Sequence, residues 1–164
     1  MVSYQINIRK AVPADCEKVY ELICELAVFE KEPDAVDITA SQLRDDAFGP
    51  NAIVNIWVGE ADGIVVGAAL YFEKYSTWKG RTLHLEDLIV NDKYRGYGIG
   101  TMLFNKVLSI SKDGGYSRME WMVLDWNAPA IEFYKKYGTE FLDEWKDCRL
   151  TRETMNKIAT NEGL

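Results

Sequence analysis

Two apolar patterns open the chain. Polar and apolar residues alternate from Tyr4 to Arg9, which predicts a strand. Between about Asp15 and Lys31, apolar residues recur at every third or fourth position, as they do on the buried face of a helix. The residues on that face are Val19, Leu22, Ile23 and Leu26. The beginning of the chain therefore predicts a strand followed by an amphipathic helix.

The middle of the chain combines a capped helix with strand patterns. Thr39-Ala40-Ser41-Gln42 is a capping-box pattern, which predicts a short helix that runs to Phe48. Asp62-Gly63 is a strong signal for a tight turn between two strands. The strands expected here are 53–60 and 64–75 on either side of that turn, followed by a third strand at 83–90.

The remaining pattern alternates helices and strands. A helix is expected after Gly100 up to about Asp113, where two glycines end it. Asn127 is typical of a helix N-cap. The other elements expected are a strand at 118–124, a helix at 128–137, a hairpin of strands 141–145 and 148–151, and a peripheral helix at 153–160. Because no repeat or linker is present, this order predicts a single α+β domain over residues 1–164, built around a mixed sheet.

Composition and charge exclude several classes of function. The 164 residues carry a formal net charge of −7, which argues against general nucleic-acid binding and suits a cationic partner. No apolar run is long enough for a transmembrane helix, and the first residues lack a signal-peptide core. The three cysteines lack metal-ligand spacing, and an odd number of them fits a reducing cytosol. We expect a cytoplasmic protein with no metal, nucleic-acid or membrane partner.

The stretch Tyr94-Arg95-Gly96-Tyr97-Gly98-Ile99-Gly100 lies between a strand pattern and a helix pattern. Glycines let backbone N–H groups approach a ligand, and a helix N-terminus adds unpaired N–H groups, so we expect a pyrophosphate here. A P-loop requires Lys after its last glycine, where this chain has Thr101. The dinucleotide fingerprint G-x-G-x-x-G requires another glycine spacing. The pattern that remains is Arg-x-x-Gly-x-Gly.

A second motif follows from Asn127 to Gly138, with Ala130, Phe133 and Tyr134 between them. Both motifs resemble the acetyl-CoA motifs of the GNAT N-acetyltransferases, Gln/Arg-x-x-Gly-x-Gly/Ala and Asn-x-x-Ala/Ser-x-x-Phe-Tyr-x-x-x-Gly. The chain is similar over roughly residues 6–150 to the spermidine/spermine (diamine) and thialysine acetyltransferase branch. The further segments that carry this resemblance include Trp78-Lys79-Gly80, Leu85-Glu86-Asp87-Leu88 and Trp126-Asn127-Ala128-Pro129.

The resemblance implies a fold, a donor and an acceptor. The GNAT fold has a mixed, mainly antiparallel sheet flanked by helices, with a splayed parallel pair of strands at the acetyl-CoA site. Acetyl-CoA is the implied co-substrate, a primary amine of a small polyamine or lysine-like molecule attacks it directly in a ternary complex, and a homodimer is implied. The residues expected to bind acetyl-CoA are Leu88, Ile89, Val90, Arg95, Gly96, Tyr97, Gly98, Ile99, Gly100, Thr101, Asn127, Pro129, Ala130, Phe133, Tyr134 and Lys136.

An amine acceptor requires a base, and the departing thiolate requires an acid. By resemblance the base is Glu86, acting directly or through a water, and the acid is Tyr134. Neighbouring strand residues point to opposite faces, so Glu86 and Asp87 share a face only if a bulge intervenes, as one does near this point in GNAT folds. We expect Glu86 to be buried among apolar neighbours and His84 to give it a supporting polar contact.

Carboxylates beside aromatic rings suit a flexible amine with methylenes and separated charges. The residues expected to bind it are Phe29, Glu30, Trp78, Glu86 and Asp87. Ser76 stands where the polyamine enzymes tend to carry an acidic residue, and their Glu-Glu-Gly-Trp pattern is absent near 144–148, so thialysine, another lysine-like amine and a short diamine all remain open. Two alternatives also remain: a peptide or protein N-acetyltransferase, and a non-catalytic acyl-CoA-binding module.

Overall fold

The computed structural model describes residues 3–162 and divides them into two units, one up to Met122 and one from Val123 onward. In the first unit five strands form one sheet in the order β1-β2-β3-β4-β5. The first four strands are antiparallel neighbours, whereas β4 and β5 are parallel. The strands are β1 (Ile6–Lys10), β2 (Asn55–Ala61), β3 (Ile64–Ser76), β4 (Gly80–Val90) and β5 (Met119–Glu120). The expected mixed α+β architecture is confirmed.

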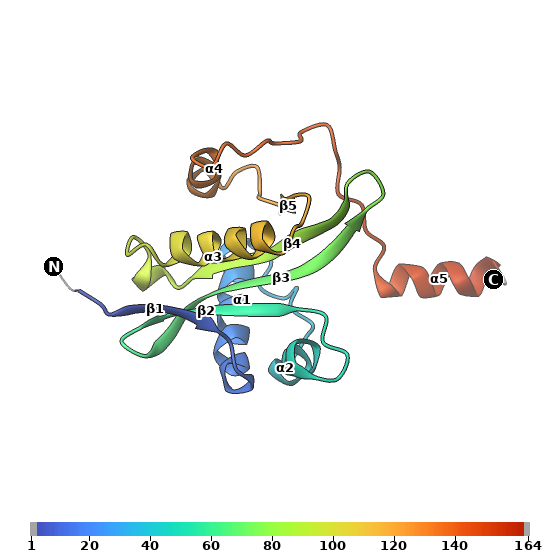
Figure 1. The fold of residues 1–164 in the computed structure, drawn as a ribbon. Helices are drawn as coiled ribbons and strands as arrows, with labels where there is room; N and C mark the ends of the chain where they lie inside the picture. The colour runs from blue at the N-terminus through green and yellow to red at the C-terminus, as the bar shows by residue number, and fades with distance from the viewer. Residues whose placement is uncertain (1–2, 163–164) are drawn as a thin grey trace. The chain divides into compact units, whose positions relative to one another are not determined.

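Helices cover both faces of this sheet (Figure 1). Two lie on one face: α1 (Cys16–Phe29), which follows the short 3-10 turn η1 (Pro13–Asp15), and α2 (Ala40–Phe48). The capping box that predicted α2 is present, because the Thr39 hydroxyl accepts from the Gln42 N–H at 3.2 Å and the Gln42 side chain accepts from the Thr39 N–H at 2.8 Å. The other face is covered by α3 (Ile99–Asp113), which follows a second 3-10 turn, η2 (Asp92–Tyr94).

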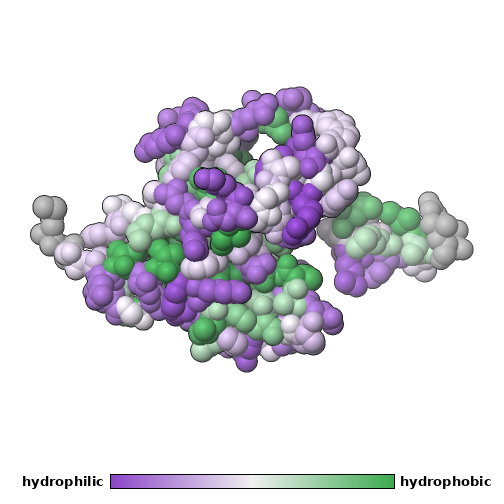
Figure 2. Space-filling model, viewed as in Figure 1, coloured by the Kyte–Doolittle hydropathy of each residue, from purple (hydrophilic) through white to green (hydrophobic). Residues whose placement is uncertain are grey.

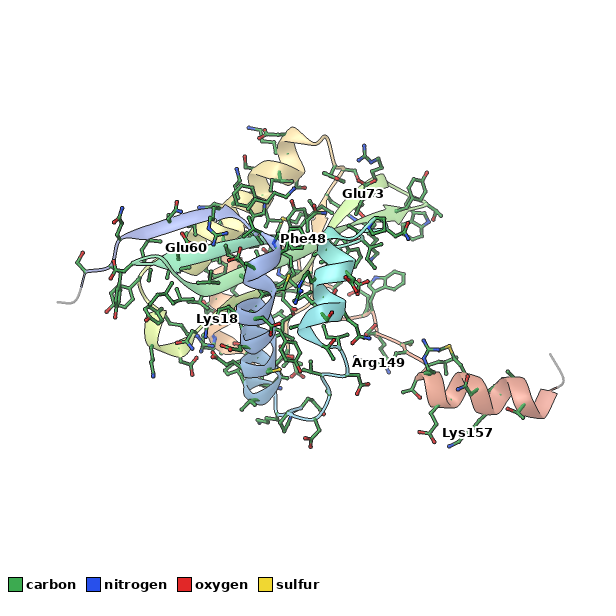
Figure 3. All side chains as sticks on the ribbon, turned by 90° about the horizontal axis from the view of Figure 1, so that it is seen from below. Lys18, Phe48, Glu60, Glu73, Arg149 and Lys157 are labelled. Carbon is green, nitrogen blue, oxygen red and sulfur yellow. The ribbon has the colours of Figure 1, made fainter. Side chains whose placement is uncertain are left out.

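A buried apolar core joins α1 and α2 to the sheet. Val19 and Leu22 of α1 are fully buried, as the helical spacing predicts, and they belong to one cluster with Leu43 of α2. Phe48, labelled at the end of α2 in Figure 3, packs against the same cluster. The sheet contributes Ile56, Val58, Val65, Ala68, Leu70 and Ile89. This core fixes the C-terminal half of α1 over the end of β4, where the candidate site lies.

Two strand glycines set how closely α3 approaches the sheet. A Cβ on Gly59 would lie 2.6 Å from Ile99 Cγ2 of α3. A Cβ on Gly67 would lie 3.3 Å from the same atom and 2.9 Å from the carbonyl oxygen of Ile89 on β4. Only glycine fits at such distances without displacing a neighbour. The first turn of α3 therefore sits directly on the sheet, and the glycine-rich loop that precedes it is held next to β4.

The register of β3 and β4 shifts at one place. Leu70 pairs with Asp87, whereas the next residue, Tyr71, pairs with Leu85. Glu86 is therefore the extra residue of a bulge, which confirms the bulge expected in this segment. A bulge bends its strand and interrupts the ladder of hydrogen bonds, and the pairing of β4 with β5 is correspondingly short.

The strand predicted over 118–124 is much shorter than expected. Only Met119 and Glu120 pair with β4, at Leu83 and His84, and the ladder ends just before the bulge. Residues 121 and 122 form no ladder with the bulged part of β4. Within the first unit, the edge of β4 beyond His84 therefore has no β5 partner, and the parallel pair is splayed as expected.

The second unit contains two helices, α4 (Ala128–Lys135) and α5 (Arg152–Glu162), as predicted. The hairpin predicted over 141–151 is wrong, because the described residues of this segment form no strand. Five of its eleven residues are charged and Thr151 is its only β-branched residue, so it lacks the cross-strand packing that stabilises a two-stranded ladder. On α5, Met155 and Ile158 are exposed, and Figure 2 shows apolar and polar surface on opposite sides of this helix.

Candidate functional site

The glycine-rich loop is anchored at its start by side chains. Asn91 follows β4 and its side chain accepts a hydrogen bond from the Lys93 N–H at 3.1 Å, which holds the turn η2. The Arg95 Nε donates to the carbonyl oxygen of Val90 at 3.1 Å, and its Nη2 lies 2.8 Å from Asp92 Oδ1. These contacts keep a guanidinium at the mouth of the loop, between the end of β4 and the start of α3.

The loop ends in an uncapped helix. Gly98 is the N-cap of α3 with φ of 84°, a left-handed conformation that favours glycine, and no side chain caps the helix there. The first N–H groups of an α-helix have no partner within the helix and carry a partial positive charge. Ile99, Gly100 and Thr101 form this first turn, so the structure brings the predicted phosphate-binding residues of the first unit together.

Three tyrosines pack beside the loop. The Tyr4 ring lies 5.1 Å from the ring of Tyr94 and 4.9 Å from that of Tyr97, measured between ring centroids. Tyr94 and Tyr97 come from the loop, whereas Tyr4 precedes β1. The segment before β1 therefore supports the loop from one side, a contact that sequence reasoning did not predict.

A cavity of about 350 Å³ lies between the C-terminal half of α1 and the end of β4. Its lining combines residues predicted for the acetyl donor with one predicted for the amine. The lining residues are Glu25, Leu26, Val28, Phe29, Ile89, Val90, Asn91, Asp92, Lys93 and Arg95. Sequence reasoning placed Phe29, Ile89, Val90 and Arg95 in the site.

The other lining residues were missed, although helical spacing offered a signal for one of them. Glu25 lies one turn before Phe29 on α1, so a helix that brings Phe29 to the site brings Glu25 as well. Its carboxylate accepts a hydrogen bond from the Asn91 side chain at 2.7 Å. This contact ties α1 to the strand end and closes one side of the cavity.

The bulge on β4 arranges the acidic residues. Glu86 Oε2 lies 3.3 Å from His84 Nε2, and the Glu86 side chain is 54% exposed. The expected contact with His84 is confirmed, whereas the expected burial of Glu86 is wrong, because the bulge turns this residue away from its apolar neighbours. The hydrogen bond from His84 lowers the pKa of Glu86 in spite of partial desolvation. Glu86 is therefore ionised at neutral pH.

Asp87 and Glu30 complete a group of three carboxylates. Burial, together with the smaller effects of the negative charges of Glu86 and Glu30, raises the pKa of Asp87 to about 6. Burial also raises the pKa of Glu30, which is the C-cap of α1. Asp87 is thus near enough to Glu86, on the bulge, and to Glu30, at the end of α1, for both charges to affect its pKa. Such a group favours a cation in its midst.

Trp78 lies elsewhere in the first unit. It is 80% exposed in the turn between β3 and β4. From Gly80 to Glu86 an extended strand rises by about 3.3 Å per residue, so the turn is about 20 Å from the carboxylates. The structure does not bring Trp78 to Phe29, Glu30, Glu86 and Asp87 within one chain.

The second unit carries the residues of the second motif on α4. The Asn127 side chain caps this helix by accepting from the Ala130 N–H at 3.3 Å, and Pro129 stands in its first turn. Phe133 packs edge-on against Tyr134 at 5.2 Å between ring centroids. Tyr134 is 7% exposed, and burial raises its pKa to about 12. Its phenol therefore keeps its proton throughout the neutral range. Lys136 is exposed at the end of α4.

Residues 16–139 match the sequence pattern of the family described as "Acetyltransferase (GNAT) family". The chain belongs to this family. A thialysine N-epsilon-acetyltransferase of Bos taurus is 41% identical over 165 residues, which cover 94% of this chain and 97% of the bovine protein. A spermidine/spermine N(1)-acetyltransferase-like protein 1 of Homo sapiens is 32% identical over 95% of this chain and 24% of the human protein.

The fold of this GNAT acetyltransferase also occurs in solved structures. An integron cassette protein from the mobile metagenome of V. cholerae superposes with a TM-score of 0.76 and 23% identity, covering 94% of this chain and 97% of the other. Acetyltransferases of the family use acetyl-CoA as the acetyl donor. Among residues 3–162, no cluster of His, Cys, Asp and Glu could hold a metal ion. None of the helices in this range is long and apolar enough to cross a bilayer.

Proposed function

We propose that this acetyltransferase transfers the acetyl group of acetyl-CoA to a primary amine of a lysine-like molecule or a small polyamine. The observation that carries the proposal is the group of three carboxylates, Glu30, Glu86 and Asp87, beside the cavity that Phe29 lines. Carboxylates attract the ammonium groups of such a substrate, and an aromatic ring suits its methylenes. The names of the bovine and human relatives point to the same class of amine.

The donor would be held by the first unit's backbone. The loop from Arg95 to Gly98 and the first turn of α3 would bind the pyrophosphate of acetyl-CoA. The open edge of β4 at Leu88–Val90 would pair with the pantetheine arm, and an N–H of that edge would donate to the thioester carbonyl as it gains charge. We also propose that residues on and around α4 bind acetyl-CoA, because the family motif places them there. They are Asn127, Pro129, Ala130, Phe133 and Lys136.

The chemistry would be a direct transfer in a ternary complex. Glu86 accepts the proton of the substrate ammonium, directly or through a water, because it is ionised and exposed to the substrate side. The neutral amine then attacks the thioester carbon, the C–S bond breaks, and Tyr134 protonates the departing thiolate. The second N–H proton of the attacking nitrogen passes to solvent, from which Tyr134 recovers its own proton. Because its phenol stays protonated, Tyr134 has a proton to donate to the sulfur as the C–S bond breaks.

An assay of CoA thiol release tests the proposal. We expect turnover with a panel of thialysine, lysine, putrescine and spermidine, and the ranking identifies the acceptor class. Calorimetry provides the matched measurement, since it detects acetyl-CoA binding without chemistry. Binding of acetyl-CoA with no turnover of any amine would favour a non-catalytic binding module. Faster turnover of a lysine-containing peptide than of every free amine would favour a peptide acetyltransferase.

Two further expectations stay predictions. A homodimer would give twice the mass of one chain in size-exclusion chromatography with light scattering. Trp78 is retained as an amine-binding residue only in such a dimer, because its turn is distant from the carboxylates of its own chain. The cytoplasmic location also stays a prediction, and fractionation of cells that express the protein would check it.

A further inference from the structure

His84 occupies a buried position between two strands and next to the bulge. It pairs with Phe72 of β3 and with Glu120 of β5, and its side chain is only 12% exposed. The imidazole packs against the Phe72 ring at 5.0 Å between centroids, with the two planes tilted by 37°. It is the single histidine of the chain. This ring is therefore fixed in position by packing on one side.

The two nitrogens of His84 have different surroundings. Nε2 lies 3.3 Å from Glu86 Oε2, whereas Nδ1 is buried and has no hydrogen-bond partner among the residues that the structure describes. A buried N–H without an acceptor is costly, whereas an unprotonated nitrogen loses less. The proton of a neutral imidazole therefore belongs on Nε2, where it is donated to the Glu86 carboxylate.

Two carboxylates lie near His84, those of Glu120 and Glu86, and they differ in how their charge is compensated. Glu120 faces His84 from β5, but its carboxylate already pairs with Lys74 at 3.3 Å and with Arg118 at 2.8 Å. Its charge is therefore compensated by two cations.

Glu86, by contrast, has Asp87 beside it on β4 and Glu30 at the end of α1. The charges of Glu86 and Asp87 repel each other, and Glu30 adds to the negative charge around Asp87. In this acidic group, the His84 Nε2–H is the donor that the structure places next to Glu86.

We propose that His84 is a positioning residue that holds the Glu86 carboxylate in place as an ionised proton acceptor by donating its Nε2–H to one carboxylate oxygen. The proposal rests on the proposed function, since it assumes that Glu86 takes the proton of the amine. The second carboxylate oxygen then stays available for the substrate. When the amine loses its proton, that proton goes to this oxygen, and His84 keeps its own proton on Nε2.

Nuclear magnetic resonance of the imidazole tests the contact without relying on activity. Because His84 is the single histidine, a ¹⁵N long-range correlation spectrum of the protein without an affinity tag reports this ring alone. At pH 7.5 we expect a protonated Nε2 and an unprotonated Nδ1. We also expect the Nε2 resonance to move in Glu86→Gln. A protonated Nδ1, or a spectrum that Glu86→Gln leaves unchanged, would overturn the proposal.

Kinetics test the positioning role. His84→Phe keeps the ring on Phe72 but removes the donor, so the pKa of Glu86 rises and kcat/KM for the amine falls more at pH 5.5 than at pH 8. A rise of one unit gives about a tenfold greater loss only at a pH below both pKa values and a smaller loss at pH 5.5, so the measurement extends to the lowest pH at which both enzymes stay folded. The measured quantity is kcat/KM of the variant divided by kcat/KM of the unmodified enzyme at the same pH. Ionisation of the amine affects both enzymes equally and therefore cancels.

His84→Gln serves as the conservative variant, since its amide also donates a hydrogen bond. We expect it to restore much of the activity at acidic pH that His84→Phe loses. Thermal unfolding checks that both variants fold. A purely structural role would lower kcat/KM of His84→Phe by the same factor at every pH, and that result would overturn the proposal. If Glu86→Gln kept full kcat while the imidazole spectrum matched expectation, the proposed base would be wrong and the contact itself would stand.

Discussion

The guanidinium of Arg95 lies over the ring of Phe29, with Cζ 5.3 Å from the ring centroid. Arg95 belongs to the glycine-rich loop, and Phe29 ends α1 beside Glu30. The contact therefore connects the proposed pyrophosphate site with the proposed amine site through two side chains. An aromatic face attracts a guanidinium, and this contact positions the cation before the donor binds.

Phe29→Leu should weaken the donor site as well as the amine site. The substitution keeps an apolar wall but removes the aromatic face, so Arg95 loses part of its positioning. We expect KM for acetyl-CoA to rise about two- to fivefold, as for the loss of an exposed cation–π contact. Val28→Ala is the control, because Val28 lines the same cavity and should leave this KM unchanged. An unchanged KM for acetyl-CoA in Phe29→Leu would show that the contact has no role in donor binding.

Asp87→Asn should weaken amine binding. Because Asp87 has a pKa of about 6, it gains its charge as pH rises through 6, and the affinity for an ammonium substrate should rise over the same range. In Asp87→Asn we expect about a tenfold higher KM for the amine at pH 7.5, as for the loss of a charged hydrogen bond. In this variant, KM for the amine should also no longer depend on pH near 6. Steady-state kinetics between pH 5 and 8 measure both effects.

The same substitution should stabilise the fold. The pKa of Asp87 is raised in the folded state, so its contribution to stability is complete below about pH 4 and is lost as pH rises through 6. Urea unfolding of Asp87→Asn should show a gain of at most about 3 kcal/mol above pH 6, which disappears near pH 4. Asp45→Asn, an exposed carboxylate of α2, should change neither stability nor kinetics. A loss of stability in Asp87→Asn would contradict the unfavourable burial of this charge.

Tyr134→Phe should lower kcat with little change in either KM. Because the pKa of Tyr134 is raised to about 12, the phenol stays protonated, and the loss should be similar throughout pH 6–9. We expect kcat to fall roughly a hundredfold, the usual contribution of a general acid. Tyr137→Phe is the matched control, since Tyr137 contacts the same Phe133 ring but follows α4 and is exposed. Full activity of Tyr134→Phe across this range would exclude the acid role.

Elements with local signals could be predicted from the sequence. The Thr39–Gln42 capping box, the Asp62–Gly63 turn and the end of α3 at Gly114 each depend on residues that are neighbours in the chain. The 141–151 segment could not be assigned in this way, because a strand there needs a partner that apolar alternation alone does not specify.

The same distinction applies to the site. The glycine-rich loop is one continuous motif, so its residues were identified together. The hydrogen bond between Glu25 and Asn91 joins positions 66 residues apart, and no local pattern indicates it. The exposure of Glu86 follows from the bulge, because one extra residue changes the side to which a strand position points.

A salt bridge outside the proposed site should govern stability in acid. Arg9 Nη1 and Nη2 lie 2.7 Å and 2.9 Å from the two carboxylate oxygens of Asp15, which also accepts from the Val12 N–H at 2.7 Å. The hydrogen bonds from Arg9 lower the pKa of Asp15 in spite of its burial. Arg9 also pairs with Glu60, labelled in Figure 3, so the network joins β1, β2 and the start of α1.

Asp15→Asn should therefore destabilise the fold by about 2–4 kcal/mol at pH 7, because it leaves a partly buried guanidinium with a weaker partner. A lowered pKa contributes stability above the unfolded value of about 3.9 that is lost as pH falls through the folded value. Urea unfolding should thus show a constant difference from pH 7 to pH 5 that shrinks below pH 4. Glu21→Gln removes the exposed pair with Lys18 and should cost less than about 0.5 kcal/mol. Equal losses in the two variants would show that burial of the Asp15 pair adds nothing.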